Sequence, residues 1–277
     1  MKAWLDGRLL ESPRDRALSV LDHGLVVGDG VFETVAVIDG EPFALTRHLD
    51  RLVTSAEGLG IARPDVDAVR EGVAATMAGQ DLAFGRIRIT VTSGPGPLGS
   101  PRGDAGLTHV VVTEPAEQPG PVSSIVTVPW TRNERGALAG LKTTSYAENA
   151  KMVEYARARG ASEAVMANTR GALCEGTGSN VMYIQGGQLV TPTLESGCLA
   201  GITRALAIEW LAEELDVVER DSPLESLFGA DEVILLGTTR MVQGIERVDD
   251  RVLDAPGPLT RRAREIWDRR MAEDLDP

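Results

Sequence analysis

Apolar residues recur at helical spacing in five segments of the chain. Within residues 46–59 the apolar positions stand three or four residues apart, which is the period of one face of an α-helix. Residues 66–77 show the same period, and so do residues 145–159, 201–215 and 258–272. The pattern therefore predicts five helices.

Other segments alternate apolar and polar residues, or form short apolar runs, as β-strands do. The clearest is "GRIRITVTSG", and a run that turns at Gly186-Gly187 predicts a hairpin. Strands are predicted at residues 85–94, 107–114, 123–130, 162–167, 180–192 and 231–239. The first 40 residues add short strands with turns at "LDGR" and "VIDGEP". The mixture predicts an α+β fold.

One segment separates two sets of predicted elements. "EPAEQPGP", residues 114–121, has three prolines in eight residues and no strand or helix pattern, so it is the best candidate for a linker. The prediction is a small first domain over residues 1–113 and a larger second domain over residues 122–277.

Composition narrows the range of functions. The net charge is −13, and no basic arm or stripe is present, which argues against nucleic acid as a partner. No apolar run approaches the roughly 20 residues of a membrane span, and the start has no secretory apolar core, so the cytoplasm is the expected location. The two cysteines and three histidines show no metal-site spacing, and no metal is expected.

Lysine is rare in this chain. Only Lys2, Lys142 and Lys151 are lysines among 28 basic residues, so each remaining lysine is a candidate for amine chemistry that arginine cannot perform. Lys142 lies in "LAGLKTTSYAEN", among small and hydroxyl-bearing residues that favour a neutral amine. From the residues alone, a surface lysine near a helix start remains the alternative.

Several residues are candidates for binding anions. Ile202 and Thr203 begin a predicted helix after Gly201, where backbone N–H groups and the helix dipole favour a phosphate. Thr238 follows Gly237 at the end of a predicted strand and is a candidate for a second anion-binding turn. An ordinary helix start and an ordinary strand end remain the alternatives.

Two arginines on one predicted strand point to another anion. Arg86 and Arg88 are two residues apart, so both side chains lie on one sheet face, where like charges repel unless an anion is present. Nucleotide and hydrolase motifs fail, because "GDGVFE" and "GTGSNV" lack a third glycine and no G-x-S-x-G segment exists.

Taken together and in order, several motifs resemble the class IV pyridoxal-phosphate aminotransferases, also called fold type IV. The resemblance runs nearly end to end through "GDGVFET", "RHLDRL", "GLKTTSYAEN", "CEGTGSNVMYI", "AGITRAL" and "DEVILLGTT". It implies the two-domain fold of D-amino-acid aminotransferases, the cofactor pyridoxal 5′-phosphate, and a homodimer that acts on small amino and 2-oxo acids.

The resemblance also assigns residues. It implies that Lys142 forms the aldimine with the cofactor and moves the Cα proton, and that Glu175 faces the pyridine nitrogen. The residues that it implies for the cofactor phosphate are Arg51, Ile202, Thr203 and Thr238. Thr239 and Tyr146 are predicted on the substrate side.

The substrate is less determined. The branched-chain pattern has an arginine four residues after Phe32, where this chain has Ala36. The best-known D-amino-acid pattern has an R-x-H carboxylate trap, which Arg102 matches only in part, so Arg88, with Arg86 or Arg102, is predicted to bind the substrate carboxylate. The interpretation is a transaminase for D-amino acids or (R)-amines. The alternative is a 4-amino-4-deoxychorismate lyase, which shares every cofactor residue.

Overall fold

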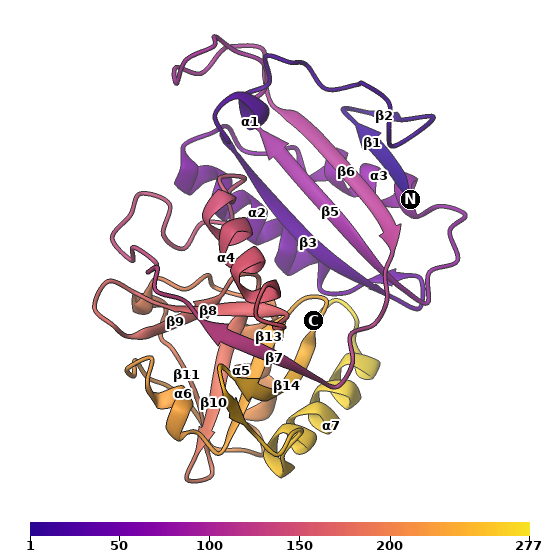
Figure 1. Ribbon diagram of the computed structural model, residues 1–277. Coiled ribbons are helices and arrows are strands. Elements are labelled where there is room, and N and C mark those ends of the chain that lie inside the picture. Colours follow the sequence, from indigo (N-terminus) through magenta and orange to yellow (C-terminus); the bar gives the residue numbers. More distant parts are fainter. The chain divides into compact units, whose positions relative to one another are not determined.

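The computed structural model describes residues 1–277 and divides into two compact units (Figure 1). Unit 1 contains residues 1–118, 141–146 and 275–277, and unit 2 contains residues 119–140 and 147–274. The chain passes from unit 1 to unit 2 after Gln118, within the expected linker. Residues 141–146 return to unit 1, so Lys142 belongs to a different unit from the one that the sequence predicted for it.

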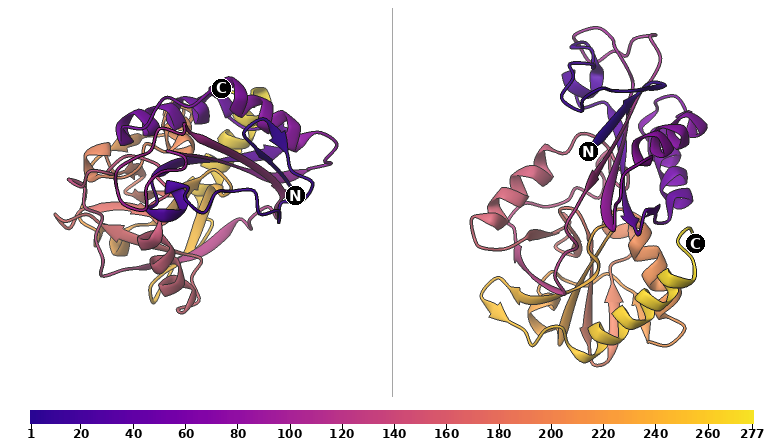
Figure 2. Two further views of the ribbon diagram at one scale, coloured as in Figure 1. Left: turned by 90° about the horizontal axis from the view of Figure 1, so that it is seen from above. Right: turned by 90° about the vertical axis from the view of Figure 1, so that its right-hand side faces the viewer.

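Unit 1 is built on a six-stranded antiparallel sheet with strand order β2-β1-β6-β5-β3-β4. Its strands are β1 (Lys2–Leu5), β2 (Arg8–Leu9), β3 (Gly30–Ile38), β4 (Glu41–Pro42), β5 (Phe84–Thr92) and β6 (Thr108–Pro115). Its helices are α1 (His23–Val26), α2 (Leu45–Leu59) and α3 (Val66–Met77). The side view in Figure 2 shows α2 and α3 together on one face of this sheet.

The alternation along β3 and β5 determines which face of the sheet receives the helices. Odd-numbered residues such as Val35, Ile87 and Ile89 are fully buried in the core that contains the apolar residues of α2 and α3. Phe32 and Arg88 have even numbers and therefore point to the opposite face. One sheet thus provides a core on one side and leaves the other side for polar chemistry.

Residues 275–277 cap the start of α2. The helix begins after Ala44, which has a φ of 54° and supplies no side-chain cap. Asp276 provides it instead, because its carboxylate accepts hydrogen bonds from the Thr46 amide at 2.8 Å and the Thr46 hydroxyl at 2.6 Å.

Unit 2 is built on a nine-stranded mixed sheet in the order β12-β11-β10-β13-β14-β7-β8-β9, with β15 paired to β14. Its strands are β7 (Val122–Thr127), β8 (Glu163–Ala167), β9 (Leu173–Gly176), β10 (Asn180–Gln185), β11 (Gln188–Thr191), β12 (Val217–Glu219), β13 (Glu232–Gly237), β14 (Met241–Val248) and β15 (Arg251–Val252). Its helices are α4 (Ala147–Arg157), the 3₁₀ turn η1 (Leu194–Ser196), α5 (Ile202–Leu211), α6 (Ser226–Gly229) and α7 (Pro258–Glu273).

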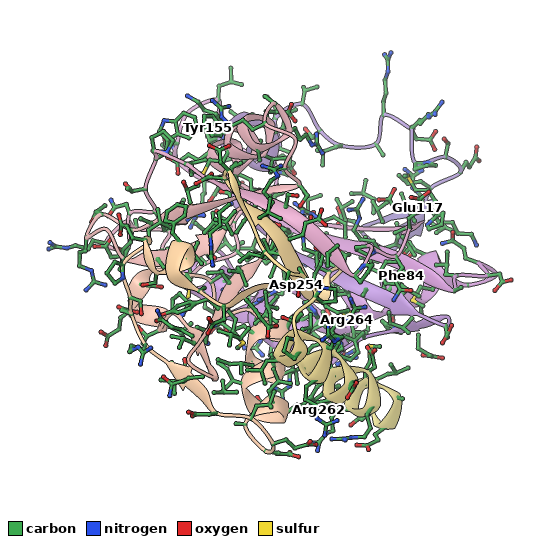
Figure 3. The ribbon with its side chains drawn as sticks, turned by 60° about the horizontal axis from the view of Figure 1, so that its bottom comes forward. Phe84, Glu117, Tyr155, Asp254, Arg262 and Arg264 are labelled. Carbon is green, nitrogen blue, oxygen red and sulfur yellow. The ribbon has the colours of Figure 1, made fainter.

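Local sequence explains the β10–β11 turn and the start of α7 in unit 2. Gly186 and Gly187 have φ values of 60° and 84°, which only glycine adopts readily, so the β10–β11 hairpin turns there as predicted. Pro258 begins α7, and Glu232 accepts hydrogen bonds from the next two amides of that helix. Arg262 and Arg264 project from α7 in Figure 3.

The sequence predicted the five long helices and six of the strand segments to within a few residues, but it did not predict α1, α6, β9, β12, β14 or β15. All five predicted helices are present as α2, α3, α4, α5 and α7. None of the helices combines the length and apolar character that crossing a bilayer requires.

Candidate active site

The backbone of Lys142 is held on two sides within unit 1. Its carbonyl accepts a hydrogen bond from the Phe32 amide of β3 at 2.9 Å, and Val31 bridges to Thr143. Its own amide donates to the Ser55 hydroxyl of α2 at 3.2 Å. Residues 141–146 therefore extend the sheet beside the start of β3, which fixes the point from which the Lys142 side chain leaves the backbone.

The Phe32 ring is the centre of a cluster in unit 1. The Lys142 amine lies 4.5 Å from the ring centroid, and the Arg88 guanidinium carbon lies 3.3 Å from it. The Tyr146 ring meets the Phe32 ring edge to face at 5.2 Å. Three residues predicted separately thus surround one aromatic ring, which the sequence marked only as a reference point in a motif.

Arg88 is the more buried of the two arginines on β5. Burial lowers the pKa of Arg88 to about 10, although Tyr146 and Glu33 oppose this shift. Its Nε–H donates to the Thr90 hydroxyl at 3.3 Å. Arg86 is exposed and forms an ion pair with Glu114 on β6. The two arginines on this sheet face therefore have different environments. Arg86 is paired with an anion within the protein, whereas Arg88 lies with Lys142 at the Phe32 ring.

Arg51 belongs to a buried cluster of charged residues around Glu33 of β3. Its guanidinium donates to both Glu33 carboxylate oxygens, at 2.8 and 2.7 Å, and His48 donates to Glu33 at 2.7 Å. Burial alone would raise the pKa of Glu33, but the Arg51 and His48 charges and hydrogen bonds hold it well below its usual range. Arg51 lies one turn before Ser55, so α2 carries both the predicted phosphate arginine and a contact to Lys142.

Arg102 has a different environment from the one predicted. Its guanidinium forms a two-pronged ion pair with Asp29 at 2.7 and 2.8 Å and also donates to the carbonyls of Leu59 and Gly60. The hydrogen bonds to Asp29 raise the pKa of Arg102. These contacts join the loop near residue 100 to the end of α2, and the structure does not bring Arg102 into the Phe32 cluster.

Glu175 is held at the end of β9 in unit 2. One carboxylate oxygen accepts from the Arg132 Nε–H at 3.1 Å, and the other accepts from the Leu199 amide at 2.9 Å. Only 8% of Glu175 is exposed. The motif "CEGTGSNVMYI" around this acid did not reveal Arg132, because the two residues are 43 positions apart.

The start of α5 lies close to Glu175. Leu199, which binds Glu175 through its backbone amide, also accepts a hydrogen bond at its carbonyl from the Asn180 side-chain amide at 2.9 Å. A side chain at Gly201 would place its Cβ 1.9 Å from the Asn180 side-chain oxygen, so this turn requires glycine. No side chain caps the first amides of α5, at Ile202 and Thr203, which leaves the helix start suited to an anion.

The second predicted turn joins the same region through the sheet. Asn180 is paired with Leu236 across β10 and β13, one residue before Gly237. Gly237 and the Arg240 amide close a turn with a 3.0 Å hydrogen bond, and Thr238 and Thr239 occupy its two central positions. Unit 2 therefore connects Glu175, the start of α5 and the Thr238 turn through Leu199 and Asn180.

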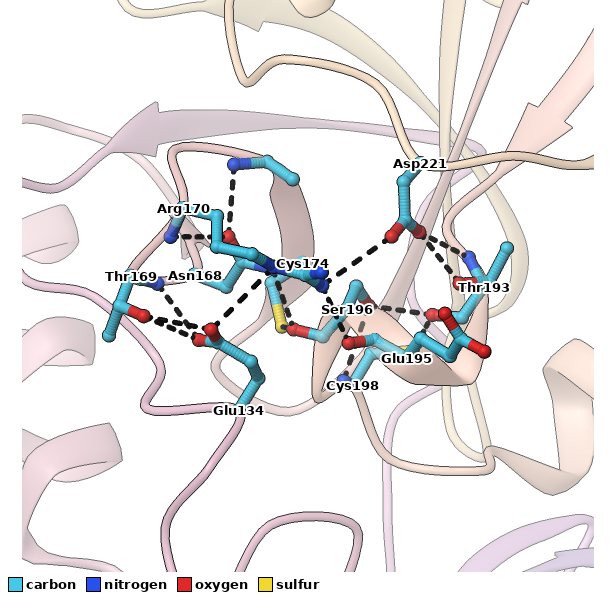
Figure 4. A network of polar contacts seen from close by, with 11 residues as sticks. Glu134, Asn168, Thr169, Arg170, Cys174, Thr193, Glu195, Ser196, Cys198 and Asp221 are labelled. Carbon is cyan, nitrogen blue, oxygen red and sulfur yellow. Dashed lines mark hydrogen bonds and ion pairs between the residues drawn. The ribbon is translucent and has the colours of Figure 1, made fainter.

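A network of polar contacts holds residues 193–196, the segment that precedes Leu199 (Figure 4). Asn168 and the Cys174 thiol both donate to the Ser196 carbonyl of η1, and Arg170 donates to the Glu195 carbonyl. Asp221 accepts from both the amide and the hydroxyl of Thr193, the residue before η1. Burial raises the pKa of the Cys174 thiol, so it packs and donates rather than reacts. The network fixes η1 three residues before Leu199.

Comparison with known proteins decides the family. A family model described as amino-transferase class IV matches residues 30–248. The chain belongs to the class IV aminotransferases. A putative branched-chain-amino-acid aminotransferase of Methanocaldococcus jannaschii is 33% identical over 273 residues, which cover 96% of this chain and 94% of that protein. A D-alanine aminotransferase of Staphylococcus epidermidis is 27% identical, with 97% of both chains covered.

A solved structure extends the comparison to the cofactor. A hypothetical aminotransferase from Mycobacterium tuberculosis, in its pyridoxal-phosphate-bound form, has a TM-score of 0.88 and 25% identity, covering 99% of this chain and all of that chain. This class IV aminotransferase is a pyridoxal-phosphate enzyme with the α+β two-domain fold of fold type IV. Each unit taken by itself carries groups whose chemistry fits this cofactor: unit 1 has the Lys142 amine, and unit 2 has the buried Glu175 carboxylate and the start of α5 without a side-chain cap.

Proposed function

We propose that this class IV aminotransferase transfers the amino group of a D-amino acid, or of a related (R)-amine, to a 2-oxo acid. The observation that carries the proposal is the position of Arg88, which stacks on Phe32 beside the Lys142 amine. A partly buried guanidinium near the reacting amine is suited to bind the substrate α-carboxylate.

The neighbouring strand supports Arg88 as the carboxylate partner. Ala36, at the position where the branched-chain pattern has an arginine, is fully buried and provides no cation. Thr34 is paired with Arg88 across β3 and β5, and Ala36 is paired with Arg86, whose charge is already matched by Glu114. The similarity to a D-alanine aminotransferase is consistent with the proposal. The similarity to a branched-chain aminotransferase makes a branched-chain L-amino acid the main alternative substrate.

The roles of the residues follow from their chemistry. When bound, pyridoxal phosphate supplies an electron sink for the charge that develops at the substrate Cα. Lys142 would hold the cofactor and then accept and return the Cα proton through its amine. Glu175 would keep the ring nitrogen protonated. Arg51, the amides of Ile202 and Thr203, and the Thr238 turn would hold the phosphate, while Tyr146 and Thr239 would border the substrate.

One half-reaction tests the substrate class. The loaded enzyme is mixed with D-alanine, D-glutamate, L-leucine or (R)-1-phenylethylamine, and conversion of the cofactor to its amine form is followed by absorbance. We expect conversion with the D-amino acids. Conversion with L-leucine alone would contradict the proposal and favour a branched-chain enzyme.

The lyase alternative requires its own assay. If aminodeoxychorismate yields 4-aminobenzoate in a Lys142-dependent reaction, and no amino donor converts the cofactor, the transaminase proposal is wrong.

Arg88 gives a matched pair of variants. Arg88→Gln should raise the KM for D-alanine about 30-fold, because a charge-assisted contact is lost, and should leave (R)-1-phenylethylamine, which has no carboxylate, nearly unaffected. Arg86→Gln, on the same strand and face, is the control and should change neither value. Equal effects of the two variants would remove Arg88 from its proposed role.

We also propose that the enzyme is a homodimer that associates through an apolar surface of unit 1. The surface consists of the exposed residues Leu18, Val20, Leu21, Leu25, Val27 and Leu98. The Gly96 amide donates to the Leu21 carbonyl, and the His23 ring contacts the Pro97 carbonyl at 2.7 Å, so the two segments form one surface.

Light scattering on the purified enzyme tests the dimer. Val20→Asp should shift the mass toward the monomer. Val252→Asp, at an equally exposed apolar residue of unit 2, should not. A monomeric parent protein would contradict the proposal.

A further inference from the structure

Glu163 is a buried acid without a role in the proposed chemistry. It begins β8, and only 2% of it is exposed. One carboxylate oxygen accepts from the Gly178 amide and the Ser179 hydroxyl, both at 2.7 Å. The other oxygen forms an ion pair with the Arg240 Nε at 2.9 Å. A buried carboxylate is costly unless its oxygens are bound, and here both are.

Arg240 is the last residue of the turn that contains Thr238 and Thr239. Its amide closes that turn, and its side chain donates to the Gln243 side-chain oxygen at 2.5 Å. Gln243 is itself buried and donates to the Gly120 carbonyl at 2.8 Å. Arg240 is thus held at its amide, at its Nε and at its outer nitrogen.

The residue after Arg240 shows that the turn needs such support. Met241 has a φ of 55°, in the left-handed region that residues with a side chain rarely adopt. A conformation of this kind persists only where the surrounding contacts determine it. Met241 is paired with Gly237 across β13 and β14, and the contacts of Arg240 with Glu163 and Gln243 hold the residue that precedes it.

Glu163 also holds the turn at residues 176–179, which follows Glu175. A Cβ atom at Gly176 would lie 2.5 Å from the Glu163 oxygen, so the backbone approaches the acid as closely as glycine permits. One carboxylate therefore connects the turn beside Glu175 with the turn that presents Thr238 and Thr239.

We propose that the Glu163–Arg240 ion pair is a positioning device that orients Thr238 toward the cofactor phosphate and Thr239 toward the substrate. The inference rests on the proposed phosphate role of Thr238. Neither Glu163 nor Arg240 contacts the reacting atoms in this scheme. They act by fixing the direction of the turn.

Glu163→Gln separates the two connections. The amide oxygen still accepts from Gly178 and Ser179, but the amide nitrogen cannot accept from Arg240. Apo-enzyme is titrated with pyridoxal phosphate and with pyridoxal, which lacks the phosphate, by quenching of tryptophan fluorescence. We expect the dissociation constant for pyridoxal phosphate to rise about tenfold, as for one lost hydrogen bond to a charged group, with that for pyridoxal unchanged.

Two further variants make the result specific. Arg240→Gln removes the same ion pair through its less buried member and should reproduce the shift, even if Glu163→Gln folds poorly. Glu232→Gln is the control, because Glu232 is also a buried acid of this sheet but binds only backbone amides of α7. It should leave the ratio of the two dissociation constants unchanged.

Thr238→Ala distinguishes failure of the inference from failure of the proposed site. If Thr238→Ala changes the ratio and neither ion-pair variant does, the positioning role is overturned and the phosphate assignment stands. If Thr238→Ala has no effect, both are overturned. If the ion-pair variants weaken both ligands equally, Glu163 is a structural residue only. A phosphate-specific loss in all three variants supports the inference.

Discussion

The two units support their predicted site residues in different ways. In unit 1 the acid Glu33 binds side chains of one helix, Arg51 and His48, and has no exposed surface. In unit 2 the acid Glu163 binds a backbone amide, a hydroxyl and one arginine from a turn. Both are buried carboxylates with an arginine partner.

This difference in support follows from the kind of group that each unit supplies to its predicted site. Unit 1 offers side chains, such as Lys142 and Arg88, and α2 and the sheet hold them in place. Unit 2 offers mainly backbone amides and short hydroxyl side chains at turns. A turn has no regular hydrogen-bond ladder of its own, so a buried side chain must supply the missing contacts. Four variants test this contrast, from the largest expected effect to the smallest.

Lys142→Ala should abolish the chemistry of unit 1. We expect the rate of the half-reaction to fall about 10⁴-fold, because the group that moves the Cα proton is lost. Lys151→Ala is the control, since Lys151 lies on α4, 4.8 Å from the Trp130 ring centroid. Borohydride reduction and peptide mapping should place the cofactor label on the peptide of Lys142. A label on another lysine would contradict the assignment.

Glu175→Gln should affect the chemistry but not the binding in unit 2. The start of α5 and the Thr238 turn remain intact, so bound cofactor should be retained. Transfer of the Cα proton should slow about 10²- to 10³-fold, as when a preorganised charge partner is removed. Stopped-flow rates with α-deuterated D-alanine measure that step. Near-normal turnover would show that Glu175 does not face the ring nitrogen.

Glu33→Gln should destabilise unit 1 by about 3 kcal/mol, because it leaves buried cationic partners without their acid. The pKa of folded Glu33 is held below its usual range, so the stabilisation is complete above the unfolded value of about 4.3 and is lost as the pH falls below it. Urea unfolding at several pH values should therefore show a shallower acid limb for Glu33→Gln than for the parent.

The control for that comparison lies on α2, the helix that carries Arg51 and His48, the partners of Glu33. Glu57 forms an exposed ion pair with Arg63 at 3.0 Å, so Glu57→Gln should cost less than about 0.5 kcal/mol. Similar losses for Glu33→Gln and Glu57→Gln would show that the buried cluster does not stabilise unit 1.

Asp276→Ala should have the smallest effect. Loss of the cap that it supplies to α2 should lower the free energy of unfolding by about 1 kcal/mol. Thr46→Val removes the hydroxyl from the same contact, and a double-mutant cycle should show that the two effects are not additive. Additive losses would mean that Asp276 contributes to the free energy of unfolding independently of its contact with Thr46.

Much of the fold was readable from the residues. The helical period at residues 46–59 and the glycine pair at residues 186–187 predicted α2 and the β10–β11 turn, because both depend on local geometry. The family was readable for another reason. Lys142 and Glu175 lie within motifs whose order resembles one family, and the family match confirms that family.

Contacts between distant residues could not be predicted. Arg102 matched part of a carboxylate trap but forms an ion pair with Asp29, 73 positions away. Phe32, Arg132 and Glu163 carry no local signal, since their partners come from other strands and turns. No spacing rule contains the register that places Arg88 opposite Thr34.

The sequence by itself therefore determined the class of chemistry and the elements that carry it. Period and glycine placement are properties of neighbouring residues, and the rarity of lysine is a property of the composition, so all three persist without a fold. Only the tertiary structure decided which charges are paired within the protein. Charge pairing depends on distances across strands and turns, so Arg86 and Arg88 share one strand yet have different partners.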